Sequence, residues 1–398
     1  MTTNEQLKAR ADRVFVGTYA RYPAAMIRGE GCRLWDADGR EYLDFLSGIA
    51  VCALGHCHPA VTAAICRQAG ELVHVSNLYY TEPQTQLAEL LVDNSFADKV
   101  FLANSGAEAN EAAIKLARIH AGEGRYQIIS LAGSFHGRTL ATVAATGQAK
   151  FHRGFEPLPE GFVHAPFGDL AALEELIGDR TCAILCEPLQ GEGGVRPLET
   201  AYLNGIRDLC DRFGLLLIFD EVQTGIGRTG TLFAHQQLAV QPDIMTVAKA
   251  LGNGLPIGAM MTTDSVAAAF VPGTHASTFG GNPVAAAAAV ASLQTILADG
   301  FLPAVQRRGQ YFQRQLQKLT ERYPDLVDGV RGMGLILGLV LTEKGVALGS
   351  EIVSGMFARG FLCNFAGNAA LRFVPPLIVS EGEIDRFVSA LADLLAEY

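Results

Sequence analysis

The feature that most constrains the fold is an alternation, from about residue 85 to residue 290, of apolar runs with helical patterns. The run KVFLANS precedes the helical pattern GAEANEAAIKLARIH, and RYQIISLAG precedes GRTLATVAATG. TCAILCEP follows a helical pattern at DLAALEELIG, and AYLNGIRDLCDRFG precedes LLLIFDE and PDIMTVAK. Strands that are apolar on both faces and alternate with helices predict an α/β fold, with a mainly parallel sheet between layers of helices.

The two ends of the chain lack this alternation. Residues 20 to 45 read as short strands joined by turns such as Asp38-Gly39. After residue 290 a long helical stretch, RRGQYFQRQLQKLTERYP, leads to VRGMGLILGLVL and a closing helix, which suggests a smaller α+β domain. We therefore expect an N-terminal segment of residues 1–48 packing with the small domain, a large domain of residues 49–290, and a small C-terminal domain of residues 291–398.

Charge and hydropathy narrow the class of protein. The net charge is −10, from 31 basic and 41 acidic residues, and no run of Lys or Arg stands out. Nucleic-acid binding rests on basic patches, so that class is disfavoured. The polar start lacks the apolar core of a secretory signal, and the longest apolar runs are shorter than the ~20 residues of a membrane helix. We expect a cytoplasmic protein with neither a nucleic-acid nor a membrane partner.

The eight cysteines are scattered, with one suggestive cluster. In CALGHCHP, the side chains of Cys52, His56, Cys57 and His58 could ligate zinc. No second C-x-x-C half accompanies them, although tetrahedral zinc sites usually show paired spacing. The preferred interpretation is buried free thiols in a reducing compartment, with no metal, and zinc is kept as the less favoured alternative.

The stretch LLLIFDEVQTGIGRTG contains a misleading motif. Gly225, Gly227 and Gly230 spell G-x-G-x-x-G, but DEVQT separates them from the apolar run, and no acid follows about 20 residues later to bind a ribose. A dehydrogenase is therefore disfavoured. The informative residue is Asp220, at the end of the run. A carboxylate buried there needs a partner, either a protonated pyridine nitrogen or an arginine.

Two further positions could bind a ligand that carries a pyridine nitrogen. Ser105 with Glu108 forms a capping box before a helix, and Gly106 lets backbone approach a ligand closely; a helix N-terminus suits a phosphate, although capping alone also explains the pattern. Lys249 ends an apolar run, where a desolvated amine could form a Schiff base, or could snorkel or pair with an acid. A phosphate cradle, a strand-end acid and a strand-end lysine are together the requirements of pyridoxal phosphate.

Motifs along nearly the whole chain resemble those of one protein family. The motifs NSGAEANEAAIKLAR, FHGRTLATVAATGQ, CEPLQGEGGV, FDEVQTGIGRTG, AKALGNGLPIGA, STFGGNPVA and RGMGLILG resemble those of the class III, ornithine-type aminotransferases of the pyridoxal-phosphate fold type I. SGIAVCALGHCHP and HVSNLYYTEPQ resemble the acetylornithine branch of that family. The resemblance implies the large and small domains of that fold.

The resemblance also implies which residues bind the cofactor. Lys249 would bind it covalently and move the proton during catalysis, and Asp220 would hold the pyridinium nitrogen. The remaining cofactor contacts would come from Ser105, Gly106 and Ala107 at the phosphate, Phe135 and Val222 on the two ring faces, Gln223 at the phenolic oxygen, and Thr278 of the neighbouring subunit at the phosphate. The contribution of Thr278 implies a homodimer with shared active sites.

Substrate contacts follow from the same resemblance. Arg138 would bind the α-carboxylate of the amino donor, and Arg372 that of glutamate or 2-oxoglutarate, as suits a bidentate guanidinium. Glu192 would pair with Arg372 while the donor occupies the site and move away when glutamate arrives. Tyr19 and Ser277 complete the expected substrate set.

Three other positions refine this interpretation. Ile49 stands where ornithine aminotransferases carry a tyrosine, which argues against free ornithine as the donor. Glu187 is expected behind the cofactor, held near Gln223. His136 is expected to be structural, because Lys249 already supplies the proton transfer.

The function implied by the branch is transfer of the δ-amino group of N2-acetylornithine to 2-oxoglutarate in arginine biosynthesis, giving N-acetylglutamate 5-semialdehyde and glutamate. Succinylornithine and 4-aminobutyrate remain rival donors, because all use an ω-amine and 2-oxoglutarate. A non-catalytic regulatory protein on the same fold is the alternative from another class, although such a protein would be expected to lose the lysine or the phosphate turn.

Overall fold

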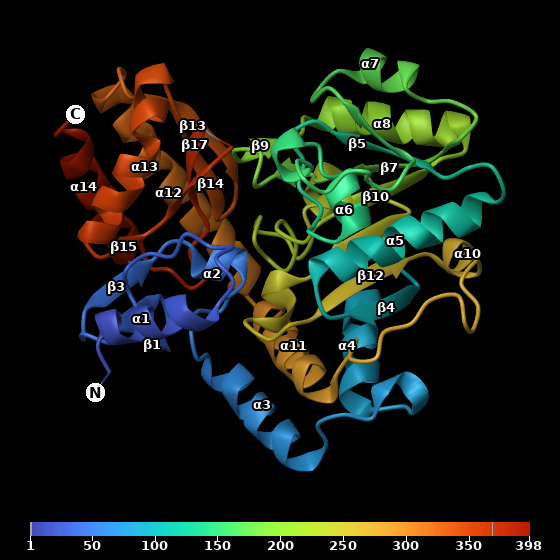
Figure 1. Ribbon diagram of the computed structural model, residues 1–398, viewed down its shortest axis with the longest axis horizontal. Helices are drawn as coiled ribbons and strands as arrows, with labels where there is room; N and C mark the ends of the chain where they lie inside the picture. Colours follow the sequence, from blue (N-terminus) through green and yellow to red (C-terminus); the bar gives the residue numbers. More distant parts are fainter. Residues whose placement is uncertain (1, 368) are drawn as a thin grey trace.

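The core of the molecule is a seven-stranded sheet, seen in a computed structural model that describes residues 2–367 and 369–398 (Figure 1). Its strand order is β4 (Lys99–Ala103), β12 (Gly258–Thr262), β11 (Ile244–Val247), β10 (Leu216–Asp220), β7 (Thr181–Cys186), β5 (Gln127–Leu131) and β6 (Phe162–Ala165). The pairs β11·β10, β10·β7, β7·β5 and β5·β6 are parallel, whereas β12 is antiparallel to both neighbours. The predicted mainly parallel sheet is confirmed.

Successive residues of the central strands point to opposite faces and join separate hydrophobic clusters. On β10, Leu216 and Ile218 pack in the cluster that contains α5 (Gly106–Ala121), while Leu217 and Phe219 pack in the one that contains α8 (Thr200–Phe213). Both helices are amphipathic and bury one face against the sheet. This double covering is why the strands read as continuous apolar runs.

The two ends of the chain come together beside this sheet (Figure 1). The N-terminal part contains α1 (Asn4–Val14), β1 (Met26–Glu30), β2 (Arg33–Asp36) and β3 (Glu41–Asp44), and Gly39 takes a φ of 86° in the expected turn between β2 and β3. Strand β15 (Phe361–Leu362), from the C-terminal part, pairs in parallel with β3. One four-stranded sheet, β1-β2-β3-β15, therefore joins segments more than 300 residues apart.

The C-terminal part carries an antiparallel sheet of order β13-β14-β17-β16 covered by helices. Its elements are α12 (Phe301–Arg322), β13 (Val327–Met333), β14 (Ile336–Leu341), α13 (Glu343–Ala358), β16 (Asn364–Ala366), β17 (Ala370–Phe373) and α14 (Glu381–Leu395). The glycine turn at Gly334 converts the single run VRGMGLILGLVL into the β13–β14 hairpin. Sequence patterns had suggested an α+β arrangement here, and the sheet and helices agree with it.

Several helices between these regions were not predicted. They are α3 (Pro59–Glu71), α4 (Glu82–Asp93) and α11 (Pro283–Ile296), the last of which contains the run VAAAAAVA and packs on the other two. Short elements complete the chain: α2 (Ser47–Ala50), η1 (Ser76–Leu78), α6 (Leu140–Ala145), η2 (Ala149–Phe151), α7 (Leu170–Glu175), β8 (Leu189–Gln190), β9 (Arg196–Pro197), α9 (His235–Leu238), η3 (Lys249–Gly252) and α10 (Asp264–Ala267). Within the described residues, no single helix has both the length and the apolar character to cross a membrane. Only α11 and α12 taken together, with a bend of 73° between them, reach that length and apolar composition.

Candidate active site

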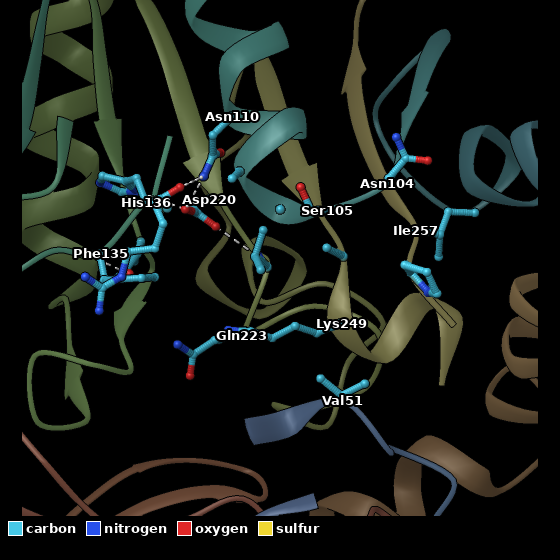
Figure 2. Close-up of a pocket in the computed structure, with 18 of the residues that line it drawn as sticks. Val51, Asn104, Ser105, Asn110, Phe135, His136, Asp220, Gln223, Lys249 and Ile257 are labelled. Atoms are coloured by element: carbon cyan, nitrogen blue, oxygen red, sulfur yellow. Dashed lines mark hydrogen bonds and ion pairs between the residues drawn. The ribbon is translucent and has the colours of Figure 1, made fainter. Parts of the chain in front are cut away.

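A cavity of about 400 Å³ opens at the carboxyl ends of β10 and β11 and beside the turn from β4 to α5 (Figure 2). Ligands of open α/β sheets gather at this edge. The cavity is lined by residues from six stretches of the chain: Val51; Asn104, Ser105, Gly106, Ala107 and Asn110; Phe135, His136, Gly137 and Arg138; Glu187 and Leu189; Asp220, Val222 and Gln223; and Ala248, Lys249, Gly254, Leu255, Pro256 and Ile257.

The turn between β4 and α5 presents the N-terminus of a 16-residue helix to the cavity. The Ser105 hydroxyl accepts the N–H of Glu108 at 3.2 Å, and the Glu108 carboxylate accepts the N–H of Asn104 at 2.6 Å, so the turn is capped from both sides. A Cβ at Gly106 would lie 2.8 Å from a methyl group of Val222, which makes glycine necessary for this packing. The free N–H groups and the helix dipole suit an anion such as phosphate.

The Asp220 carboxylate is buried at the end of β10 and receives three hydrogen bonds. Oδ2 accepts from His136 Nδ1 and from Asn110 Nδ2, both at 2.8 Å, and Oδ1 accepts from the N–H of Val222 at 3.0 Å. Among the described residues no arginine pairs with Asp220, whose partner at ion-pair distance is His136, so the alternative of an arginine partner is wrong. Its negative charge is held rigidly, as a cationic ring nitrogen would require.

Asn110 and His136 were not predicted to act on Asp220. The side-chain oxygen of Asn110 also accepts the Thr246 hydroxyl at 2.7 Å, so a buried hydrogen-bond chain runs from β11 through α5 to Asp220. Figure 2 shows Asn110, His136 and Asp220 gathered at one end of the cavity. A signal existed for Asn110, because it is a polar residue on the face of α5 that is otherwise buried and apolar.

Lys249 lies directly after β11 and faces the cavity (Figure 2). Its backbone has a φ of 45°, which is unusual for a residue with a side chain. Desolvation by the surrounding protein lowers the pKa of the Lys249 amine to about 8, which the negative charge of Glu192 only partly opposes. About a tenth of the amine is therefore neutral and nucleophilic at pH 7, far more than for a lysine with the ordinary pKa.

Arg372 is buried on β17 and forms an ion pair with Glu192, with Arg372 Nη1 2.6 Å from Glu192 Oε1. The Gln223 side chain bonds to both partners, accepting from Arg372 and donating to Glu192, each at 3.3 Å. Burial raises the pKa of Glu192, but the Arg372 charge and hydrogen bond outweigh it and hold the pKa below its ordinary value. The expected contact between these two residues is formed, and it occupies the guanidinium edge that a carboxylate would use.

Glu187 lies beside Asp220, with their ligand atoms within 4.8 Å of each other. One oxygen accepts the N–H of Phe135 at 3.3 Å, and the other, although buried, has no hydrogen-bond partner among the described residues. Burial, and then the charge of Asp220, raise the pKa of the Glu187 carboxyl well above its ordinary value. The expected link to Gln223 is not among its hydrogen bonds.

Arg138 is exposed at the cavity and rests on aromatic rings. Its guanidinium carbon lies 4.1 Å from the ring centroid of Phe151 and 5.5 Å from that of Phe135. Among the described residues Arg138 has no ion pair. Its donors are free to bind an incoming carboxylate.

Besides Glu192 and Arg372, which reach the cavity through Gln223, three expected contacts lie outside the cavity of this chain. Tyr19 is 73% exposed, on the N-terminal segment, and Thr278 is exposed on the loop before α11. Ser277 reaches the lining indirectly, because its hydroxyl accepts a hydrogen bond from Asn104 at 3.3 Å. The roles of these three residues stay predictions.

The cysteine cluster gives a mixed outcome. His56 Nε2 bonds to the Asp44 carboxylate at 2.7 Å, and the four residues of the cluster do not form a metal-ligand group within the described chain. The expectation of buried thiols is wrong for Cys57 and Cys66, which are exposed. Among the residues that the structure describes, the one group with metal-ligand spacing is His136, Glu187 and Asp220, whose ligand atoms lie within 4.8 Å of one another and which line the cavity already described.

Pyridoxal phosphate fits these residues. An anion cradle at α5, a fixed carboxylate at Asp220 and a partly neutral amine at Lys249 surround one cavity of about 400 Å³. These groups match the phosphate, the ring nitrogen and the aldehyde of that cofactor. Phe135 and Val222 also line the cavity, as the expected ring contacts require.

Comparison with known proteins agrees with this assignment. The family model described as aminotransferase class-III matches residues 17–395. An acetylornithine aminotransferase of Caldanaerobacter subterraneus subsp. tengcongensis is 51% identical over 384 residues, which cover 96% of each chain. A structure of the ornithine aminotransferase from Toxoplasma gondii, with partial occupancy of pyridoxal phosphate at its active site, matches with a TM-score of 0.94 and 32% identity, covering 100% of this chain and 95% of that one.

A crystal structure of acetylornithine aminotransferase from Elizabethkingia anophelis matches with a TM-score of 0.88 and 30% identity and covers 100% of both chains. The expected fold type and cofactor are confirmed by these likenesses. The chain belongs to the class-III aminotransferases, which depend on pyridoxal phosphate.

Proposed function

We propose that this enzyme transfers the δ-amino group of N2-acetylornithine to 2-oxoglutarate, giving N-acetylglutamate 5-semialdehyde and glutamate. The observation that carries the proposal is the different state of two arginines, Arg138 in the cavity lining and Arg372, which bonds to the lining residue Gln223. Arg138 is free of any ion pair among the described residues, whereas Arg372 is covered by Glu192. The relatives at about half identity that bear the name acetylornithine aminotransferase support this choice of donor.

The covered Arg372 explains how one site could serve two substrates. While Glu192 holds Arg372, the free receptor is Arg138, which binds the α-carboxylate of the donor and leaves the distal amine to reach Lys249. A dicarboxylate offers a second carboxylate, which competes with Glu192 for Arg372. Glu192 then moves aside, and both arginines bind the substrate.

The chain's own groups perform the proton transfer. Pyridoxal phosphate, when bound, supplies the aldehyde that takes up the amino group and the ring that draws electrons from the carbon losing its proton. The Nζ atom of Lys249 takes that proton and returns it, which its pKa of about 8 permits near neutral pH. The Asp220 carboxylate would hold the protonated ring nitrogen of that cofactor.

We also propose that the enzyme is a homodimer with shared active sites. The exposed side chains of Leu78, Tyr79 and Tyr80 belong to one segment, and those of Val271 and Phe279 to another. The two segments are tied by Asn77, which donates to the carbonyl of Ser277 at 2.8 Å. Exposed apolar groups of this number suit a subunit interface, and Thr278 lies among them.

We further propose that the enzyme is cytoplasmic and takes part in arginine biosynthesis.

The test is an assay of purified enzyme with pyridoxal phosphate and 2-oxoglutarate. It compares kcat/KM for N-acetylornithine, N-succinylornithine, ornithine and 4-aminobutyrate. We expect the acetyl compound to be preferred, and we expect Lys249→Ala to lose at least about 100-fold in kcat together with the absorbance of the bound cofactor. Equal use of 4-aminobutyrate would overturn the choice of donor, and a fully active Lys249→Ala enzyme would overturn the assigned chemistry.

A further inference from the structure

The two arginines of the site are held in different ways. Arg372 is buried and paired with a carboxylate, which must leave before a substrate can bind. Arg138 is exposed and packs on the ring of Phe151, which belongs to the short helix η2 (Ala149–Phe151). The guanidinium carbon of Arg138 lies 4.1 Å from the centroid of that ring. Phe151 itself does not line the cavity.

An aromatic ring is a suitable support for a receptor that must stay open. A guanidinium held over a ring face by its charge uses none of its N–H donors on a carboxylate, so they stay available to a ligand. A carboxylate partner would occupy those donors, as Glu192 does at Arg372. A long exposed side chain without such support would sample many rotamers and would have to be ordered at each binding event.

Phe151 touches two further groups of the site. Its ring meets the ring of Phe135, which lines the cavity, at 5.5 Å between centroids and 79° between planes. The amine of Lys150 lies 4.8 Å from the same Phe151 centroid, so a second positive charge accompanies Arg138. Phe151 thus joins the carboxylate receptor to the aromatic wall of the cofactor cavity.

We propose that Phe151 is a positioning residue, whose ring holds the Arg138 guanidinium in place to receive the α-carboxylate of the amino donor. The inference rests on the proposed function, because it needs Arg138 to bind that carboxylate. It adds a residue that does not line the cavity and acts through Arg138.

The experiment uses two donors that differ only in the carboxylate. N-acetylornithine carries it, and N-acetyl-1,4-diaminobutane is the same molecule without it. The measured quantity is the ratio of their kcat/KM values in the holoenzyme, for wild type, Phe151→Leu, Phe151→Tyr and Arg138→Gln. Phe155→Leu is the matched control, since Phe155 lies in the same loop and is 56% exposed. Absorbance of the bound cofactor is recorded for each variant.

We expect Phe151→Leu to lower the ratio about three- to tenfold, mainly through KM for N-acetylornithine, because the cation–π support is lost while apolar bulk remains. Phe151→Tyr, which keeps a ring, should restore the ratio, and Phe155→Leu should leave it unchanged. Arg138→Gln should abolish the preference for the carboxylated donor.

The outcomes that contradict the inference are distinct from those that contradict the function. An unchanged ratio in Phe151→Leu, with both donors reduced equally, would mean that Phe151 only braces Phe135, and would overturn the inference. Loss of the ratio in Phe151→Tyr would overturn it as well. A wild-type enzyme without preference for the carboxylated donor would overturn the role of Arg138 in the proposed function, and the inference with it.

Discussion

At the scale of single residues, two carboxyl groups, those of Asp220 and Glu187, lie in the same buried wall of the site but differ in their hydrogen bonds. Asp220 receives three hydrogen bonds, whereas Glu187 receives one, from the N–H of Phe135. Two neighbouring carboxylates in a low-dielectric site cannot both ionise at ordinary cost. The donors gather on Asp220, whereas burial and then the charge of Asp220 raise the pKa of Glu187 well above its ordinary value, so Glu187 holds its proton more strongly than an ordinary glutamic acid.

This assignment predicts the behaviour of Glu187→Gln. The amide has the shape of a neutral carboxylic acid, so we expect kcat/KM within about threefold of wild type, whereas Glu187→Ala opens a buried cavity and loses more. The folded pKa of Glu187 lies above its ordinary value of 4.5, so the native state binds more protons and wild type loses stability as the pH rises above that value. The Gln variant should escape this loss. Its Tm relative to wild type should therefore rise from pH 5 to pH 8, and a constant difference would show that Glu187 is ionised in the native enzyme.

A site residue could be predicted where its neighbours in the sequence mark it as unusual. Asp220 and Lys249 do so, because each is a charged group at the end of an apolar run. Asn110 lies 110 positions before Asp220 in the sequence, and spacing alone says nothing of their hydrogen bond. Phe151 looks like any apolar loop residue, since its role depends on the folded position of Arg138.

At the scale of elements, the turn from β4 to α5 restricts which residues can occupy it, because it is capped and closely packed. Ser105 and Glu108 cap the helix, and Gly106 lies against Val222, which lines the same cavity. The close contact keeps the first turn of α5 open to a ligand. Any side chain at position 106 must displace Val222 or the helix end.

We therefore expect Gly106→Ala to weaken binding of pyridoxal phosphate by about tenfold, or ~1.4 kcal/mol, within the usual cost of overpacking. The measurement is a titration of cofactor-free enzyme followed by protein fluorescence. The control is Gly382→Ala in α14, where a Cβ meets nothing within 4 Å. That change should leave cofactor affinity unaltered and raise stability by about 0.5–1 kcal/mol. Equal cofactor affinity in both variants would refute the packing argument at Gly106.

The elements that escaped prediction did so for identifiable physical reasons. Helix α11 is buried almost all round, with no polar face to reveal a helical period. Strand β12 is buried along its whole length, as the parallel strands are, so burial does not encode its antiparallel direction. The pairing of β3 with β15 joins the two ends of the chain, and no local pattern signals such a contact.

At the scale of the whole molecule, the cavity of one chain holds most but not all of the expected groups. Thr278 is exposed and does not line it, although it is the residue expected at the phosphate of a neighbouring subunit. Its loop also presents Val271 and Phe279 to solvent, beside the segment that carries Leu78. We expect a second copy of the chain to cover this surface and Thr278 to reach the phosphate site of that copy.

A hybrid enzyme tests whether the sites are shared. Lys249→Ala removes the catalytic amine, and Thr278→Asp puts a negative charge where a phosphate is expected, so each homodimer should be inactive. Random pairing of the two chains makes half of the dimers hybrids, and a shared arrangement places both lesions in one of their two sites. The other site is intact, so co-expression should restore about a quarter of wild-type activity. If each site were built from a single chain, both sites of every hybrid would carry one lesion and no activity would return. Recovery therefore requires Thr278 to act across the interface, which fixes both the dimer and the orientation of its subunits.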